Sequence, residues 1–205
     1  MTMDIDALIE QRYSANHFDA TRHVDDVTLT ELLRLATLAP SAFNAQNRRF
    51  VVASSVKAKE RLLRHANGQD KVVHAAATVV VVGRLAPHAT LAAALQPSVD
   101  AGVIDADLQA TLVHYADAMY RDQPQNQRDE AIRSASLSAM TLMLAAQGAG
   151  LVSCPMIGFD AAGVHREFGL GNDEIPVMLV AIGHAAAGNW PQKPRLPLAD
   201  VLAWQ

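Results

Sequence analysis

The run Thr78-Val-Val-Val-Val82 constrains the fold of this chain more than any other segment. Five consecutive β-branched residues leave no polar face, which is typical of a strand that is buried on both sides. Ile175–Gly183 is a second continuous apolar strand, and Phe50–Ala53 is a shorter one. Together these segments predict a central sheet that is covered on both faces.

Apolar residues at helical spacing predict the elements around this sheet. Thr28-Leu-Thr-Glu31 reads as a capping box, with Thr28 as the N-cap of a helix that Pro40 ends. Further helices are predicted at residues 4–11, 56–65, 72–77, 106–120, 127–147 and 161–168. Asp160 is the predicted N-cap of the last of these helices, and Gly169 is its end.

Three regions are predicted to lack a regular helix. Residues 87–105 are predicted to be irregular, because two prolines and a glycine interrupt them. Residues 123–126 are predicted to be a loop, and Leu151–Ser153 a brief extended piece. From residue 186 onward the chain reads as an extended arm. Its apolar end, Leu198–Trp204, needs a cover, and a partner subunit is one candidate.

Length and composition bound the class of protein. With 205 residues, 50% of them hydrophobic and 19% charged, the chain is expected to form one domain over residues 1–205. The net charge of −4, without a lysine or arginine run, gives no attraction for nucleic acid or anionic lipid. Ala75–Val82, at eight residues, is too short to span a bilayer. We therefore expect neither nucleic acid nor a membrane as a partner.

Cysteine and histidine usage addresses compartment and metal binding. Cys154 is the single cysteine, so an intramolecular disulfide is excluded and a reducing compartment is expected. The start of the chain is acidic and polar, unlike a secretory signal, which makes a cytoplasmic location the expectation. Eight histidines are present without a close pair or a His-Glu-x-x-His motif, and no metal site is predicted.

Polar residues gather in three places along the chain. Arg12, Ser14, Lys193 and Arg195 offer the forked, point-charge and hydroxyl donors that suit a phosphate, although each alone reads as an ordinary surface group. The loop Ala39–Asn47 offers amide donors and acceptors for a planar polar ligand, with a polar loop at a helix end as the alternative.

The third place is Cys154-Pro-Met-Ile-Gly158, where the glycine permits close approach of a ligand to the backbone. A turn packed into the core is the alternative interpretation. No Rossmann glycine pattern, Walker loop or Gly-x-Ser-x-Gly elbow is present, so a dinucleotide-binding domain, a nucleoside triphosphatase and a serine hydrolase are poorly supported.

Taken in order, these motifs resemble those of the FMN-dependent nitroreductase family. Arg12-Tyr-Ser14 matches its Arg-x-Ser element, with Asn16 where lysine or arginine is usual. Ala39–Gln46 matches Ala-Pro-Ser-x-x-Asn-x-Gln, with Asn47-Arg48 in place of Pro-Trp. Gln69 matches an amide near the next helix, Pro155–Asp160 matches Pro-x-x-Gly-Phe-Asp, and Lys193-Pro-Arg195 matches the closing Lys-x-Arg.

The resemblance implies an α+β fold around a mixed, mainly antiparallel sheet, and an intertwined homodimer that exchanges its C-terminal arm. FMN would bind at the dimer interface, partly through residues of the second subunit. The cofactor-binding residues implied are Arg12, Tyr13, Ser14, Asn16, Pro40, Ser41, Ala42, Asn44, Gln46, Gln69, Pro155, Met156, Ile157, Gly158, Lys193 and Arg195.

The family's chemistry is carried by FMN, so no catalytic side chain is implied. NADH or NADPH would reduce the flavin, which would then reduce a nitroaromatic, a quinone or a related conjugated acceptor by ping-pong kinetics. The alternative function is an FMN-binding carrier or redox sensor without turnover, and a dimeric structural protein is a third. Asn16 removes a positive charge near the cofactor, and Asn47-Arg48 removes an aromatic residue.

Overall fold

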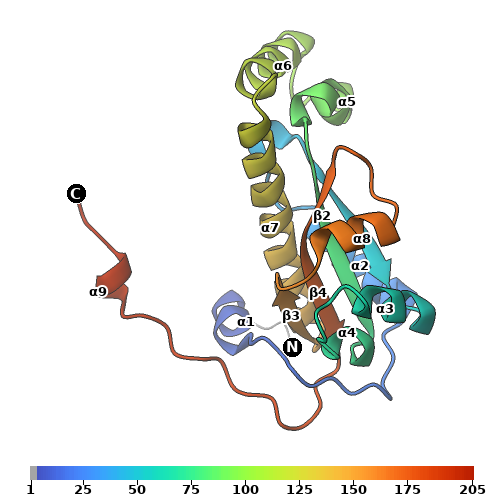
Figure 1. Ribbon diagram of the computed structural model, residues 1–205. Helices are drawn as coiled ribbons and strands as arrows, with labels where there is room; N and C mark the ends of the chain where they lie inside the picture. The colour runs from blue at the N-terminus through green and yellow to red at the C-terminus, as the bar shows by residue number, and fades with distance from the viewer. Residues whose placement is uncertain (1–3) are drawn as a thin grey trace.

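The computed structural model describes residues 4–205 and has a four-stranded sheet at its centre (Figure 1). The strands are β1 (Arg48–Ala53), β2 (Ala77–Arg84), β3 (Val152–Met156) and β4 (Glu174–Gly183), in the order β1-β2-β4-β3. All three pairings are antiparallel. Among the described residues, the parallel component is the isolated bridge between Ser14 and Ser153. The α+β class is confirmed, and the mixed character of the sheet is limited to that bridge.

The valine run occupies the interior of this sheet, as expected. β2 lies between β1 and β4, and every residue from Ala77 to Gly83 is buried. Val80 and Val82 pack into one layer of the core, and Val79 and Val81 pack into the layer on the opposite face. The continuous apolar run therefore reflects a strand with covered faces on both sides.

Helices form the two outer layers. The long helix α7 (Pro124–Gly148) and α2 (Asp26–Ala36) cover one face of the sheet (Figure 1). The opposite face is covered by α3 (Val56–Leu63), α4 (Lys71–His74) and α8 (Ala161–Glu167). Gly83 allows the close approach of α7, because a Cβ there would lie 2.6 Å from the Ala131 carbonyl oxygen.

The remaining helices lie at the ends of the molecule. The helix pair α5 (Pro87–Asp100) and α6 (Ala106–Tyr120) stands at the N-terminal end of α7, and α1 (Ile5–Gln11) lies near the C-terminal end of α7 (Figure 1). The short 3-10 helix η1 (Ala42–Asn44) follows α2. No helix in the range 4–205 combines the length and the apolar character that crossing a membrane requires.

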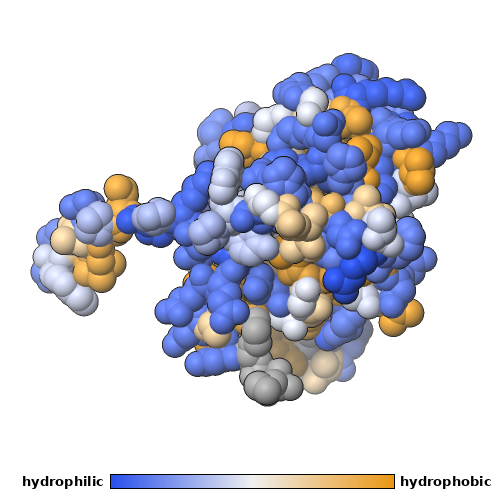
Figure 2. Space-filling model, turned by 90° about the horizontal axis from the view of Figure 1, so that it is seen from below, coloured by the Kyte–Doolittle hydropathy of each residue, from blue (hydrophilic) through white to orange (hydrophobic). Residues whose placement is uncertain are grey.

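The C-terminal arm is extended, as predicted. Residues 186–205 contain one short helix, α9 (Leu198–Val201), and all residues from Pro191 onward are exposed. The arm leaves the body of the molecule, and Figure 2 shows apolar side chains at its outer end. Leu198 is 68% exposed and Trp204 is 88% exposed, so the arm is not covered by its own chain.

The structure corrects three of the predicted elements. Residues 87–100 form a helix rather than an irregular segment. Pro87 stands in its first turn, where a backbone N–H has no hydrogen-bond partner within the helix, and Gly102, with a left-handed backbone, follows its end. Residues 124–126 form the first turn of α7 rather than a loop, again with proline at the helix start. β3 runs from Val152 to Met156, so it extends three residues beyond the extended piece predicted at 151–153.

The predicted capping box is wrong. Helix α2 begins at Asp26 and ends at Ala36, before Pro40. Its N-cap is Asp25, whose side chain accepts a 2.6 Å hydrogen bond from the Thr28 amide. Glu31 pairs with Arg34 instead of returning to the start of the helix. A carboxylate three residues before Thr28 caps as well as a threonine hydroxyl does, and it starts the helix earlier.

Candidate functional site

The two ends of the described chain meet in one polar cavity. The cavity has a volume of about 310 Å³ and lies between the end of α1 and the start of the C-terminal arm. Its lining contains the four residues predicted for phosphate binding, two of their neighbours in the N-terminal segment and three from the arm: Arg12, Tyr13, Ser14, Asn16, Trp190, Pro191, Gln192, Lys193 and Arg195. Residues 12 and 195 are thus brought together by the fold.

Two amide side chains hold the arm against the N-terminal segment. Asn189 Oδ1 accepts hydrogen bonds from the Asn16 and His17 amides at 2.7 and 3.0 Å, and its Nδ2 donates to the His17 carbonyl. Gln192 Nε2 donates to the carbonyl oxygens of Arg12 and Ile9. Neither amide was selected from the sequence, because nothing in the local pattern marks a residue whose partner lies more than 170 positions away.

The donors in this cavity fit an anionic group. Arg12 Nη1 is buried and has no hydrogen-bond partner within residues 4–205. A buried guanidinium nitrogen without a partner costs free energy unless a ligand or solvent satisfies it. Lys193 stacks its ammonium over Trp190 at 5.0 Å from the ring centre, and Arg195 lies exposed beside it. No carboxylate lines the cavity, so its formal charge is positive.

Asn16 is paired with a lysine that the sequence interpretation missed. Lys71 Nζ donates to Asn16 Oδ1 at 2.8 Å and lies 3.6 Å from Cys154 Sγ. A positive charge is therefore present beside position 16, although residue 16 itself is neutral. Burial raises the pKa of the Cys154 thiol, and the positive charge of Lys71 opposes that rise only in part. Cys154 is thus a buried thiol, as its position in β3 suggests.

The turn after β3 is fixed by two amide side chains. Asn67 Nδ2 and Gln69 Nε2 both donate to the Gly158 carbonyl, at 3.0 and 2.9 Å. We name these two residues the amide clamp. A third bond runs beside it, from the Asp160 amide to the His65 carbonyl at 2.8 Å. Gln69 is one of the residues predicted from the sequence, and Asn67 is not.

The predicted residues of this turn differ in their exposure. Pro155 is half-buried and Met156 is buried within β3, whereas Ile157 is 81% exposed and Gly158 is exposed. Because the amide clamp holds the Gly158 carbonyl, the exposed backbone around Ile157 has a defined orientation. A large aliphatic side chain on such a fixed, exposed turn suits contact with a planar ligand or another subunit.

The loop Ala39–Asn47 is rigid and strained. Phe43, Asn44 and Gln46 all have left-handed backbone angles, with φ of 55°, 55° and 51°. Such angles are uncommon outside glycine and persist where the surroundings enforce them. Ser41 Oγ accepts from the Gln46 amide at 2.9 Å, and the buried carboxylate of Glu130 accepts from the Ala42 amide at 3.2 Å. Pro40, Asn44 and Gln46 remain exposed on this fixed loop.

Asn47 and Arg48, which stand where Pro-Trp is usual in the family that the sequence resembles, tie the end of this loop to backbone carbonyls. Asn47 Nδ2 donates to the Arg84 carbonyl at 3.0 Å. Arg48 Nη2 donates to the Thr37 carbonyl at the end of α2, where a helix favours positive charge. Both side chains are buried, and burial lowers the pKa of Arg48. Two side-chain hydrogen bonds to the backbone therefore occupy the position expected for an aromatic contact.

The loop lies far from the cavity of Arg12 in this chain. Ala42 bonds to Glu130 on the first half of α7, whereas Leu8, next to the cavity, lies 3.8 Å from where a Cβ on Gly148 would be. The axial distance from residue 130 to residue 148 of a helix is about 27 Å. The predicted site residues thus form two separate groups: one at Arg12, Gln69 and Gly158, and the other at residues 40–46.

The chain matches the family described as "Nitroreductase family" over residues 9–184. It is 35% identical over 204 residues to a Bacillus subtilis protein provisionally named NAD(P)H nitroreductase YodC, covering 100% of both chains. It is 37% identical over 177 residues to a second Bacillus subtilis protein, provisionally named NAD(P)H nitroreductase MhqN, covering 86% of each.

A solved structure from Exiguobacterium sibiricum, described provisionally as a nitroreductase in complex with FMN, is also similar. Its TM-score to this chain is 0.91 at 29% identity, covering 99% of this chain and 98% of that one. Fold and sequence similarity thus extend over nearly the whole length of the two chains.

Proposed function

Because this chain belongs to the nitroreductase family, we propose that it is an FMN-dependent oxidoreductase that takes electrons from NADH or NADPH. The observation that carries the proposal is the positive cavity in which Arg12, Lys193 and Arg195 come together. The acceptor we propose is a nitroaromatic compound, a quinone or a related conjugated molecule. A single domain over residues 1–205 and a cytoplasmic location, where NAD(P)H is available, are parts of the same proposal.

In this proposal the cavity holds the FMN phosphate. A dianionic phosphate accepts charge-assisted hydrogen bonds from guanidinium groups, and the unpartnered Nη1 of Arg12 offers such a bond. Ser14 adds a hydroxyl, and Lys193 and Arg195 add positive charge. Tyr13 and Asn16 complete the wall. Lys71 supplies the charge that residue 16 lacks, so the substitution at position 16 is compatible with flavin binding.

The flavin ring is proposed to lie against Pro155, Met156, Ile157 and Gly158. The amide clamp orients the backbone of this turn, which would then present a fixed amide to the ring. When bound, FMN supplies two-electron chemistry by accepting hydride from NAD(P)H and passing electrons to the acceptor in a ping-pong sequence. The protein's residues bind and orient; none is required as an acid or base.

We propose that the active form is a homodimer with its sites at the interface. Residues 40–46 lie too far from the cavity of Arg12 to serve the same ligand from one subunit, but a two-fold partner can present its own loop there. An apolar groove of about 730 Å³ between α1, α2 and α7 offers a surface for such a partner. Val27 and Leu38 on its rim are 80% and 67% exposed.

The exposed C-terminal arm supports the same arrangement. Its apolar end finds no cover on its own subunit, and exchange with a partner would bury it. In this proposal the loop of one subunit, with Pro40, Ser41, Ala42, Asn44 and Gln46, lines the flavin held by the other.

An absorbance spectrum of the purified protein, followed by anaerobic titration with NADH and with NADPH, tests the proposal. We expect flavin absorbance that either donor bleaches and that a nitroaromatic or quinone restores. A colourless protein that does not take up added FMN would exclude the function. Protein that binds FMN but oxidises no NAD(P)H with any acceptor would instead indicate a flavin carrier or redox sensor.

A further inference from the structure

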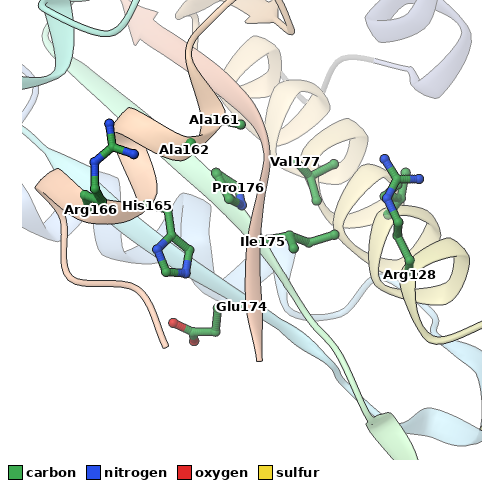
Figure 3. Close-up of a pocket in the computed structure, with 10 residues that line it drawn as sticks. Arg128, Ala161, Ala162, His165, Arg166, Glu174, Ile175, Pro176 and Val177 are labelled. Atoms are coloured by element: carbon green, nitrogen blue, oxygen red, sulfur yellow. The ribbon is translucent and has the colours of Figure 1, made fainter. Parts of the chain in front are cut away.

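A second cavity, of about 580 Å³, lies beside the first half of β4 (Figure 3). β3 pairs with β4 only as far as Met156, opposite Leu179, and the chain then turns away into α8. Among the described residues, no strand covers this side of β4 from Glu174 to Met178. The uncovered edge, α7 and α8 form the walls of the cavity. We propose that it binds an organic anion with an apolar body, as part of the substrate site.

The floor of the cavity suits an apolar body. Ile132 of α7 and Ile175 and Val177 of β4 line it, and all three are half-buried. Figure 3 shows Ile175 and Val177 between the two helices. A volume of several hundred Å³ with an apolar lining and a few polar groups is typical of a small-molecule site.

The free charge around the cavity is positive. Arg128 and Arg166 stand on opposite sides of it (Figure 3), and neither takes part in the salt bridges found among residues 4–205. The pKa of Asp160 is lowered mainly by the hydrogen bond that its carboxylate accepts from the Gly163 amide, and Arg166 adds to this only through space. Glu174 is already neutralised, because Arg49 binds it through two hydrogen bonds and Arg84 through a third, which lowers the pKa of its carboxyl to about 2.

His165 adds a further polar group. Its Nε2 lies 2.9 Å from the Gly171 carbonyl oxygen, which can only accept, so Nε2 is the donor of this hydrogen bond. In a chain of net charge −4, two unpaired guanidinium groups around an apolar floor select for an anionic ligand. A carboxylate or a phosphate would serve equally as the anionic end.

The position of the cavity connects it to the proposed flavin site. Ala161 and Ala162 line the cavity, and they follow Gly158 by three and four residues. A ligand there would lie at the start of α8, directly after the turn that the amide clamp fixes. This inference rests on the proposed function, because it makes the ligand a substrate. The anion has two sources, the phosphates of NAD(P)H and an acidic electron acceptor.

Matched acceptors test the inference in the FMN-loaded protein. 4-Nitrobenzoate and 4-nitrobenzamide share a ring and a nitro group but differ in charge. In Arg128→Ala/Arg166→Ala we expect KM for the acid to rise about tenfold, the scale of a lost charge-assisted hydrogen bond, with KM for the amide changed less than about twofold. Arg121→Ala is the control, because that arginine pairs with Asp117 on α6. A rise in the KM of NADH and NADPH instead would identify the dinucleotide phosphates as the anion.

Unchanged KM values for the acid and for both dinucleotides would overturn the inference. Calorimetric titration of the protein with 4-nitrobenzoate and with NADP+ provides a readout that needs no turnover. If the wild-type protein binds no FMN, the proposed function fails, but this titration still tests the cavity. Binding that the double variant weakens would retain the anion site, and equal binding to the double variant would reject it.

Discussion

Arg12 and Arg48 show how two buried guanidinium groups can have different roles. Each has one Nη1 without a hydrogen-bond partner among the described residues. Arg48 donates its other terminal nitrogen to the end of α2 and lines none of the cavities described above, which indicates a structural role. Arg12 lines an open, positively charged cavity. Because Arg12 lines such a cavity and Arg48 does not, Arg12 is the residue whose loss should weaken ligand binding.

Replacing Arg12 tests the phosphate site. We expect Arg12→Ala to weaken FMN binding by about 1.5 to 3 kcal/mol, because one charge-assisted hydrogen bond is lost. Fluorescence titration of the FMN-free protein measures the effect. Arg22→Ala, at an exposed arginine outside the cavity, should leave the affinity unchanged. Equal affinities for the wild type and Arg12→Ala would remove the residue from the site.

Glu174 predicts a pH dependence of stability. Its folded pKa of about 2 lies below the ordinary value of 4.5, so the ionised form stabilises the fold above pH 4.5, and this contribution is lost as the pH falls toward 2. At pH 7 we expect Glu174→Gln to lower the free energy of unfolding by about 2 kcal/mol, allowing for the partly exposed arginines.

The measurement for Glu174 is denaturant unfolding of both proteins between pH 7 and pH 2. The gap between wild type and variant should narrow as the pH falls through this range. Glu31→Gln is the matched control, because Glu31 also forms a two-bond pair with an arginine but does so on the surface. A gap that stays constant down to pH 2 would contradict the assignment.

At the scale of elements, the turn after β3 depends on a helix end that is distant in sequence. The segment from His65 to Gln69 follows α3. The His65 carbonyl accepts a hydrogen bond from the Asp160 amide, and the amide clamp donates two to the Gly158 carbonyl. Asn67 adopts a left-handed φ of 51°, which asparagine tolerates better than most residues. The amide clamp therefore fixes the position of the exposed backbone at Ile157 relative to the end of α3.

Removing one hydrogen bond of the amide clamp should change the binding and spectrum of the flavin more than the stability of the fold. In Asn67→Gly, which removes the side-chain amide but keeps the left-handed backbone angle without strain, we expect FMN affinity to fall about fivefold, the scale of one neutral hydrogen bond, and the flavin absorbance bands to shift. Asn126→Ala is a matched control, because Asn126 also donates to a backbone carbonyl, that of Met119, at 3.1 Å. If both variants lose the same stability and neither changes FMN affinity or spectrum, the clamp does not position the cofactor.

Hydrophobic periodicity predicted which helices and strands form better than it predicted where they begin and end. The run Thr78–Val82 sufficed for a covered central strand, because burial on both faces leaves a direct mark on composition. Proline was misleading at residues 87 and 124, where a helix start makes its missing amide harmless. Asp25 and Thr28 compete as caps, and sequence alone does not rank them.

The candidate site was predictable only in part, because sequence patterns are local and many of its contacts are not. Its local motifs stand out in the sequence, but the side chains that join them do not. Lys71, Asn189 and Gln192 act through partners 55, 173 and 180 residues away, so their roles emerge only after folding. The positive charge beside Asn16 comes from a lysine 55 residues away, and no sequence spacing predicts that Lys71 supplies it.

At the scale of the whole molecule, α7 acts as a spacer between the two groups of site residues. One face of this helix is buried against the sheet, and its other face exposes Leu137 and Met140, which are 41% and 37% accessible. Exposed apolar residues along a central helix suit the two-fold contact that we propose. The dimer and the flavin site should therefore be lost together.

A charge on the exposed face of α7 tests this link. We expect Leu137→Arg to convert the dimer to a monomer, as measured by light scattering, and to lower FMN affinity at least tenfold, because the partner loop is lost. Asp129→Arg is the control, since Asp129 is exposed on the same helix but near its N-terminal end. A monomeric variant that retains full FMN affinity would show that one subunit forms the site alone.

The separation of the two groups along α7 also has a genetic consequence. Under the proposed two-fold arrangement, each site takes Arg12 from one chain and the loop of residues 40–46 from the other. A subunit defective at Arg12 and a subunit defective in the loop would pair to give one doubly damaged site and one intact site. Two inactive alleles expressed in the same cell should therefore restore activity to each other, whereas two alleles damaged in the same group should not.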